Sequence, residues 1–120
     1  MTIKVGINGF GRIGRMVLRS IIENSRKDIE VVAINNRGNN EVSSFLLKHD
    51  TIHGRLKAKV THSDKSILVN DKEIQMSHET EISKINWKKY NIDVVLECTG
   101  KFNTKDKSAE HLKAGVKKVL

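Results

Sequence analysis

IKVGINGFGRIG, residues 3–14, joins a strand-like apolar run to a glycine-rich turn. The apolar run has the length of a strand, and Asn8-Gly9 after it is a turn signal. From Gly11 onward apolar residues recur at helical spacing, which predicts a helix as far as about Glu23. A strand, the spacing G-x-G-x-x-G and a helix, in this order, form the fingerprint of a dinucleotide-binding unit.

Each glycine of this turn has a physical task. Gly9 allows a tight turn, Gly11 leaves room for a pyrophosphate to approach the backbone, and Gly14 lets the helix pack closely on its strand. The phosphates then meet free amides at the positive end of the helix dipole. This setting favours dinucleotide binding over a purely structural glycine turn.

Further strands and helices follow the same alternating plan. Two apolar runs, residues 29–34 and 92–96, are typical of strands buried on both faces of a parallel sheet. A second, shorter helix is expected over residues 42–48. Asn103 or Thr104 can cap a third helix that Gly115 terminates, and a last strand begins at residue 116.

Between about residues 55 and 76 the pattern changes to near alternation, with turn signals between the short runs. It predicts antiparallel hairpins. The fold class expected for the chain is therefore α/β: a Rossmann-type doubly wound parallel sheet with a small antiparallel insert at about 55–76. Trp87 is expected to pack this insert onto the core.

Composition narrows the class of protein. The chain has 120 residues, 38% hydrophobic and 30% charged, which fits one globular domain. Its apolar runs are too short to span a membrane and its N-terminus lacks a signal-peptide pattern, so a cytoplasmic protein is expected. The net charge of +8 suits either a phosphate-bearing ligand or a polynucleotide.

The residue after the second strand bears on the choice of cofactor. A carboxylate usually holds the ribose hydroxyls there, but this chain has Asn36, followed by Arg37. An amide can bind a hydroxyl without repelling a 2′-phosphate, and an arginine can bind that phosphate. NAD is expected and NADP stays open, as does the alternative that Asn36 and Arg37 are only turn residues.

The sequence predicts neither a metal site nor a catalytic residue. His49 and His53 stand four apart, but the residues around them indicate a turn, so loop hydrogen bonding is favoured over zinc. Cys98 follows a buried strand without a basic neighbour that would activate it. We therefore expect Cys98 to be a core thiol.

Taken in order, these motifs make the chain resemble the N-terminal half of the glyceraldehyde-3-phosphate dehydrogenase family. The resemblance is carried by residues 3–15, 31–35, 47–54, 94–102 and 111–119. Relatives such as erythrose-4-phosphate dehydrogenase share much of this half, so the motifs specify the family better than the aldehyde.

The resemblance implies a set of cofactor contacts. Residues 8–13 would wrap the dinucleotide, with Arg12 and Ile13 over the pyrophosphate. Asn36 would lie at the adenosine ribose, and Thr80 would lie near the adenine, where the family often has arginine. The full set of candidate cofactor-binding residues is Asn8, Gly9, Phe10, Gly11, Arg12, Ile13, Asn36, Arg37, Thr80, Thr99, Gly100 and Phe102.

The resemblance also implies what the chain would lack. Residues 1–120 would be a dinucleotide-binding domain incomplete at its C-terminus, with the catalytic domain absent. The parent would be a cytoplasmic, homotetrameric glycolytic or gluconeogenic enzyme that oxidises an aldehyde phosphate with NAD(P) and inorganic phosphate. Its nucleophilic cysteine and activating histidine would lie beyond residue 120, so the chain alone is expected to be inactive.

Two alternatives of another class remain. One is a non-catalytic dinucleotide-binding module, and the other is a nucleic-acid-binding module. Basic charge alone supports only unspecific, salt-sensitive binding to nucleic acid. The chain has one Trp, one Tyr and three Phe, with no interleaved aromatic and basic stripe, so specific nucleic-acid binding is disfavoured.

Overall fold

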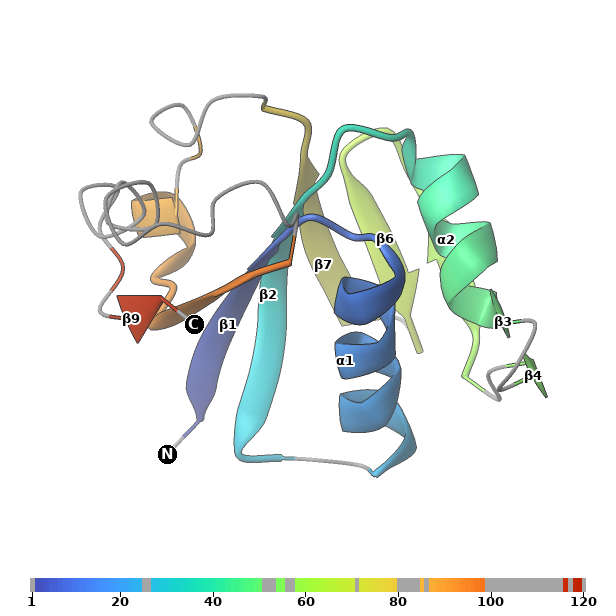
Figure 1. Ribbon diagram of the computed structural model, residues 1–120, viewed down its shortest axis with the longest axis horizontal. Helices are drawn as coiled ribbons and strands as arrows, with labels where there is room; N and C mark the ends of the chain where they lie inside the picture. The colour runs from blue at the N-terminus through green and yellow to red at the C-terminus, as the bar shows by residue number, and fades with distance from the viewer. Residues whose placement is uncertain are drawn as a thin grey trace.

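The computed structural model describes residues 2–24, 27–50, 54–55, 58–70, 72–79, 85, 87–98, 116 and 118–119. The predicted helix from Asn103 or Thr104 to Gly115 lies outside them. Among the described residues, two α-helices lie on one side of the sheet and a 3₁₀ helix lies on the other (Figure 1). This arrangement is a Rossmann-like α/β fold, as predicted.

One sheet forms the centre of the described structure. Its seven strands lie in the order β5-β6-β7-β2-β1-β8-β9. Parallel pairs join β1 to β2 and β8, β2 to β7, and β8 to β9. The strands, in chain order, are β1 (Ile3–Asn8), β2 (Ile29–Asn35), β5 (Val60–His62), β6 (Ser66–Val69), β7 (Lys72–Ser77), β8 (Val94–Glu97) and β9 (Lys118–Val119).

The predicted antiparallel insert is present, but it does more than decorate the sheet. Strands β5, β6 and β7 pair antiparallel, as expected. Strand β7 also pairs in parallel with β2, with Ile34 opposite Met76. The parallel set therefore gains a strand that the sequence did not assign to it, because alternating apolar residues do not reveal the direction of the neighbouring strand. A further two-stranded pair joins β3 (His49–Asp50) to β4 (Gly54–Arg55).

Both helices begin close to their predicted positions. Helix α1 spans Arg12–Glu23, with Gly11 as its N-cap. Helix α2 spans Asn40–Lys48 and begins before the predicted residue 42, because the side chain of Asn39 accepts a hydrogen bond from the Val42 N–H at 2.8 Å. The connection from β2 to α2 is correspondingly short.

The buried face of α1 differs from the one that its pattern predicts. Ile13 is 67% exposed and Met16 is also exposed, whereas Arg19 is only 5% exposed. The Arg19 guanidinium donates to the carbonyl of Leu47 at 3.4 Å and forms an ion pair with Glu23 at 3.3 Å. These partners allow a charged side chain to be buried between the two helices.

Helix α2 also departs from its apolar pattern. The structure exposes Val42, Phe45 and Leu46, the apolar residues whose helical spacing predicted this helix. Polar side chains form its buried face instead, together with Leu47. Asn40 donates to the carbonyls of residues 63 and 64, which fixes the first turn of the helix on the hairpin. The inward-facing residues of α2 are Asn40, Ser43, Ser44 and Leu47.

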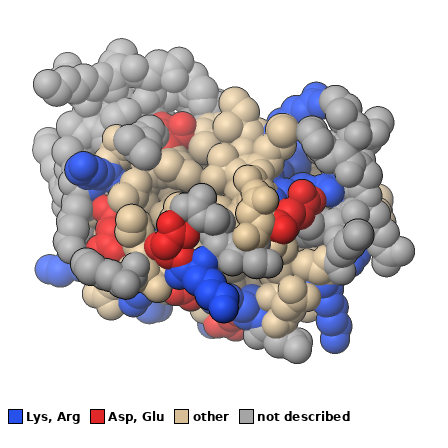
Figure 2. All heavy atoms as spheres, turned by 90° about the horizontal axis from the view of Figure 1, so that it is seen from below, with Lys and Arg blue, Asp and Glu red and all other residues tan. Residues whose placement is uncertain are grey.

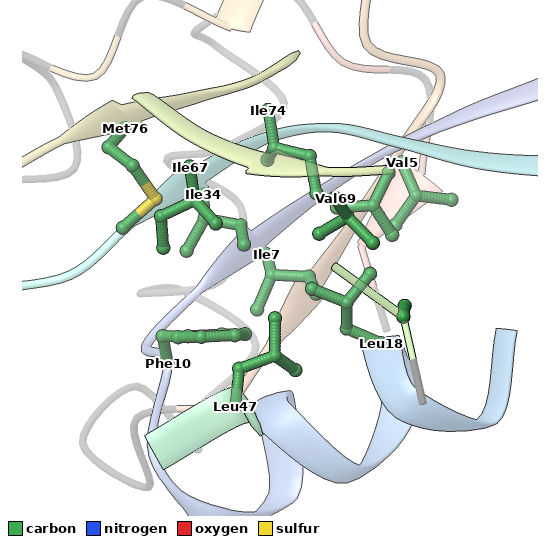
Figure 3. Packing of buried hydrophobic residues seen from close by; sticks show 12 residues of the cluster. Val5, Ile7, Phe10, Leu18, Ile34, Leu47, Ile67, Val69, Ile74 and Met76 are labelled. Atoms are coloured by element: carbon green, nitrogen blue, oxygen red, sulfur yellow. The ribbon is translucent and has the colours of Figure 1, made fainter. Parts of the chain in front are cut away.

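Two apolar clusters cover the two faces of the sheet. On the helical side, Phe10, Leu18 and Leu47 pack against strand residues such as Ile7 and Ile34 (Figure 3). On the other side, Trp87 of the 3₁₀ helix η2 (Trp87–Tyr90) lies in a second cluster with Ala33, Ile85, Ile92, Val95 and Val116.

The position of Trp87 corrects the expectation from sequence. Its ring lies so close to β1 that a Cβ at Gly6 would be 2.7 Å from the indole. The insert strands belong to the cluster on the opposite face. Trp87 therefore packs on β1 rather than joining the insert to the core, because η2 lies on the face of the sheet away from α1.

Candidate functional site

The carboxyl ends of the parallel strands meet at one edge of the sheet. Strand β1 is followed by α1 and then β2 on one side, whereas β8 pairs on the other side of β1. The order of connection therefore reverses between β1 and β8. Ligands of open α/β sheets bind at such a reversal, beyond the carboxyl ends of the strands.

Polar side chains tie these strand ends together. Asn8 donates to the Glu97 carboxylate at 2.7 Å, and its own side-chain oxygen accepts from Asn35 at 2.9 Å. The Asn35 oxygen accepts from the Ser77 hydroxyl at 2.7 Å and from the Glu79 N–H at 2.9 Å. Asn8 and Asn35 are buried, so this network fixes the floor of the site.

The glycine-rich turn lies directly above this floor. Gly9 has φ of 93°, and its N–H donates to the Asn35 carbonyl at 2.8 Å. A Cβ at Gly14 would lie 2.5 Å from the carbonyl oxygen of Gly9. The predicted tasks of Gly9 and Gly14 are thereby confirmed: one makes the turn and the other allows close packing.

Gly11 differs from the other two glycines. A Cβ there would meet none of the described atoms within 4 Å, so packing within the described protein does not require glycine at this position. No side chain among the described residues caps α1 at Gly11, and the first turn contains no acidic residue. The free amides and the positive helix end therefore fit an anionic group such as a pyrophosphate.

Both the side chain and the backbone of Phe10 are fixed by contacts within the protein. Its side chain is 2% exposed and lies in the core (Figure 3). Its N–H donates to Asn36 Oδ1 at 3.2 Å, and its carbonyl accepts from the Arg15 guanidinium at 3.2 Å. Phe10 therefore shapes the turn from below, whereas Arg12 and Ile13 are exposed at the start of α1.

Asn36 lies beside the turn, just after β2. Its side-chain Nδ2 donates to the Ser43 hydroxyl oxygen at 3.2 Å, and its N–H donates to the Ser77 carbonyl at 2.9 Å. The Nδ1 of His78 lies 2.6 Å from the carbonyl oxygen of Asn36. Arg37 follows as an exposed residue. Sequence reasoning missed Ser43 and His78, because a contact between separate elements leaves no local signal.

Four of the candidate cofactor-binding residues lie outside the described part of the chain: Thr80, Thr99, Gly100 and Phe102.

Cys98 directly follows β8 and is half-buried. Its N–H donates to the Asn8 carbonyl at 2.8 Å. Burial, and then the neighbouring Glu97 carboxylate, raise the pKa of the Cys98 thiol. This environment agrees with a core thiol rather than a nucleophile.

Other kinds of site find no support in the described ranges. These ranges contain no group of three or more His, Cys, Asp or Glu side chains able to hold a metal ion, and His53 lies outside them. None of the helices described is long and apolar enough to cross a membrane. At the amino ends of the strands, Figure 2 shows basic and acidic side chains interspersed, without a single large basic patch among the coloured residues.

Comparison with known proteins agrees with this geometry. Residues 3–105 match the family model described as "Glyceraldehyde 3-phosphate dehydrogenase, NAD binding domain". The whole chain is 50% identical to a glyceraldehyde-3-phosphate dehydrogenase of Cereibacter sphaeroides and 46% identical to glyceraldehyde-3-phosphate dehydrogenase 2 of Bacillus subtilis. A Thermotoga maritima relative is 45% identical over 98% of the chain. In each case the chain spans 35% of the relative's length.

Proposed function

The chain belongs to the family of glyceraldehyde-3-phosphate dehydrogenase NAD-binding domains, and on this premise we propose that residues 1–120 form the cofactor-binding part of a phosphorylating aldehyde dehydrogenase. The observation that carries the proposal is the start of α1. There an uncapped helix end meets a glycine whose missing side chain serves no packing contact in the described protein. A pyrophosphate supplies the reason for both features.

Each side of the turn has a role in this proposal. Gly11, Arg12 and Ile13 receive the pyrophosphate through their backbone amides, and Phe10 and Asn8 hold the turn on the sheet. Asn36 binds the adenosine ribose, with Arg37 at the rim. Thr80, Thr99, Gly100 and Phe102 remain assigned to the cofactor by family resemblance alone. When bound, NAD supplies the hydride acceptor.

The chemistry itself belongs to residues outside this chain. Cys98 is half-buried beside a carboxylate, so it is unsuited to attack an aldehyde. We therefore expect the 120-residue chain to bind an adenine dinucleotide weakly and to catalyse no turnover. Aldehyde phosphate and inorganic phosphate are proposed as substrates of a longer parent, and a cytoplasmic homotetramer is proposed as its form.

The test is a variant that blocks the turn without disturbing the fold. Gly11→Val places a side chain where the pyrophosphate would lie, and the backbone of Gly11 at φ −78° and ψ −160° accepts any residue. Calorimetric titration with NAD should show binding by the wild type and none by the variant. Urea unfolding of both proteins controls for a general loss of structure.

Two results would overturn the proposal. One is NAD binding by Gly11→Val at wild-type strength, because the turn would then not be the site. The other is oxidation of glyceraldehyde 3-phosphate by the purified 120-residue chain with NAD and phosphate. In that case the chain would contain its own nucleophile.

A further inference from the structure

We propose that Ser43 is a positioning residue that holds the nitrogen end of the Asn36 amide against α2 and so favours NAD over NADP. The inference rests on the proposed function, because it assumes that Asn36 lies at the adenosine ribose. It assigns a role in cofactor choice to α2, which the sequence did not connect with the site.

The Asn36 amide is hydrogen-bonded at both ends. Its Oδ1 accepts from the Phe10 N–H at 3.2 Å, and its Nδ2 donates to Ser43 Oγ at 3.2 Å. A flipped amide would bring its own N–H groups against the N–H of Phe10, so the Phe10 N–H sets the orientation. The Ser43 hydroxyl, which can donate or accept, then accepts from Nδ2. The oxygen end therefore lies on the phosphate turn and the nitrogen end on α2.

The surroundings leave the amide little freedom to turn. The main chain of Asn36 is held at its N–H by the Ser77 carbonyl and at its carbonyl by His78. A Cβ at Gly38 would lie 3.3 Å from Asn36 Nδ2, so the nitrogen end is closely approached by the loop. Ser43 is 3% exposed, and its N–H donates to the Asn39 carbonyl within the helix.

This orientation decides what the amide offers to a ribose. A carbonyl oxygen has two acceptor sites, and the Phe10 N–H uses one of them. The other can accept from a ribose 2′-hydroxyl, as a carboxylate would. A 2′-phosphate offers acceptor oxygens, to which an amide oxygen forms no hydrogen bond and an amide nitrogen can donate. By accepting from Asn36 Nδ2, Ser43 engages one of the two N–H groups that could otherwise donate to a 2′-phosphate.

A matched pair of variants tests this role. Ser43→Ala removes the acceptor for Asn36 Nδ2. Ser44→Ala removes a neighbouring buried hydroxyl that donates to the Glu41 carbonyl at 2.9 Å and approaches His62 at 3.3 Å. Dissociation constants of the 120-residue chain for NAD and NADP would be measured by calorimetry. Ser43→Cys, with a weaker acceptor of similar size, provides a second variant should the alanine variant unfold.

The expected result concerns the ratio of the two constants. We expect Ser43→Ala and Ser43→Cys to lower the preference for NAD over NADP by about fivefold to tenfold, and Ser44→Ala to leave it unchanged. In an Asn36→Ala background, Ser43→Ala should have no effect on the ratio. If Ser43 had only a structural role, its replacement would weaken the binding of NAD and of NADP equally, and the ratio of the two constants would stay the same.

The outcomes separate this inference from the proposed function. An unchanged ratio in the Ser43 variants, with NAD still bound, overturns the role of Ser43 alone. The role of Ser43 is also overturned if Ser44→Ala changes the ratio as much as Ser43→Ala does. It is overturned likewise if Ser43→Ala still changes the ratio in the Asn36→Ala background. Failure of the wild type to bind either dinucleotide overturns the proposed function, and this inference with it.

Discussion

Asn8 Nδ2 donates to Glu97 Oε1 at 2.7 Å, which joins β1 to β8 at the point where the order of connection reverses. The two residues are also direct partners in the parallel register. A side-chain contact at this place supports the glycine turn, because Gly9 follows Asn8 immediately. The carboxyl ends of β1 and β8, beside the glycine turn, are thus joined by a side-chain hydrogen bond.

Removal of the Glu97 carboxylate should destabilise the protein. Glu97→Ala leaves the buried Asn8 amide without this acceptor, which should lower the free energy of unfolding by about 1–3 kcal/mol. Glu97→Gln keeps an acceptor oxygen, so it should lower the free energy of unfolding by less. Urea unfolding followed by fluorescence of Trp87, which is 1% exposed in the native state, measures both values. Equal losses in the two variants would contradict the role assigned to the acceptor.

A methyl group at Gly14 should be costly despite the better helix propensity of alanine. The new Cβ would lie 2.5 Å from the backbone oxygen of Gly9, which cannot move without opening the turn. We expect Gly14→Ala to lower the free energy of unfolding by about 1–3 kcal/mol. Met16→Ala, at an exposed position of the same helix, is the control and should change stability little. Urea unfolding measures the stability of both variants. An unaltered or increased stability of Gly14→Ala would refute the close packing of Gly14 against the Gly9 carbonyl.

The elements predicted best are those with a strong local pattern. Strand β1, the glycine turn, α1 and β2 all lie where the sequence places them, because strand length, turn signals and helical period agree there. The parallel pairing of β7 was not predicted, since period-two alternation is the same for either direction of the neighbour. Pairing direction is set by which strand end the chain returns to, and this is a property of the whole fold.

The site was predicted only as far as the motif reaches. The tasks of Gly9 and Gly14 follow from the spacing of the motif, and the structure confirms them. The buried face of α2 was missed, because its inward serines and asparagine bond to the hairpin and to Asn36. Hydrogen bonds to partners distant in sequence can outweigh apolar periodicity in determining which face of a helix is buried. Such bonds leave no local pattern in the sequence.

Cys98 should ionise at a higher pH than an ordinary thiol. Burial, and then the Glu97 carboxylate, raise the pKa of the folded thiol above that of the unfolded chain. The resulting stability is present below the unfolded pKa and is lost as the pH rises through the folded pKa. Alkylation of the native protein by iodoacetamide should therefore show a midpoint at higher pH than the urea-unfolded protein. Glu97→Gln should shift the native midpoint to lower pH, and an unmoved midpoint would exclude the influence of the carboxylate.

Cofactor preference should respond to both residues that follow β2. Asn36→Asp can keep the hydrogen bond from Phe10 and adds a charge that repels a 2′-phosphate, so NADP binding should weaken relative to NAD. Arg37→Ala removes a cation at the exposed rim and should weaken NADP while leaving NAD nearly unchanged. A charged hydrogen bond there is worth at most about 1.5–3 kcal/mol, so each change should move the NADP/NAD ratio by about one to two powers of ten. Dissociation constants for both cofactors give this ratio. A shift below about twofold in both variants would show that Asn36 and Arg37 are only turn residues.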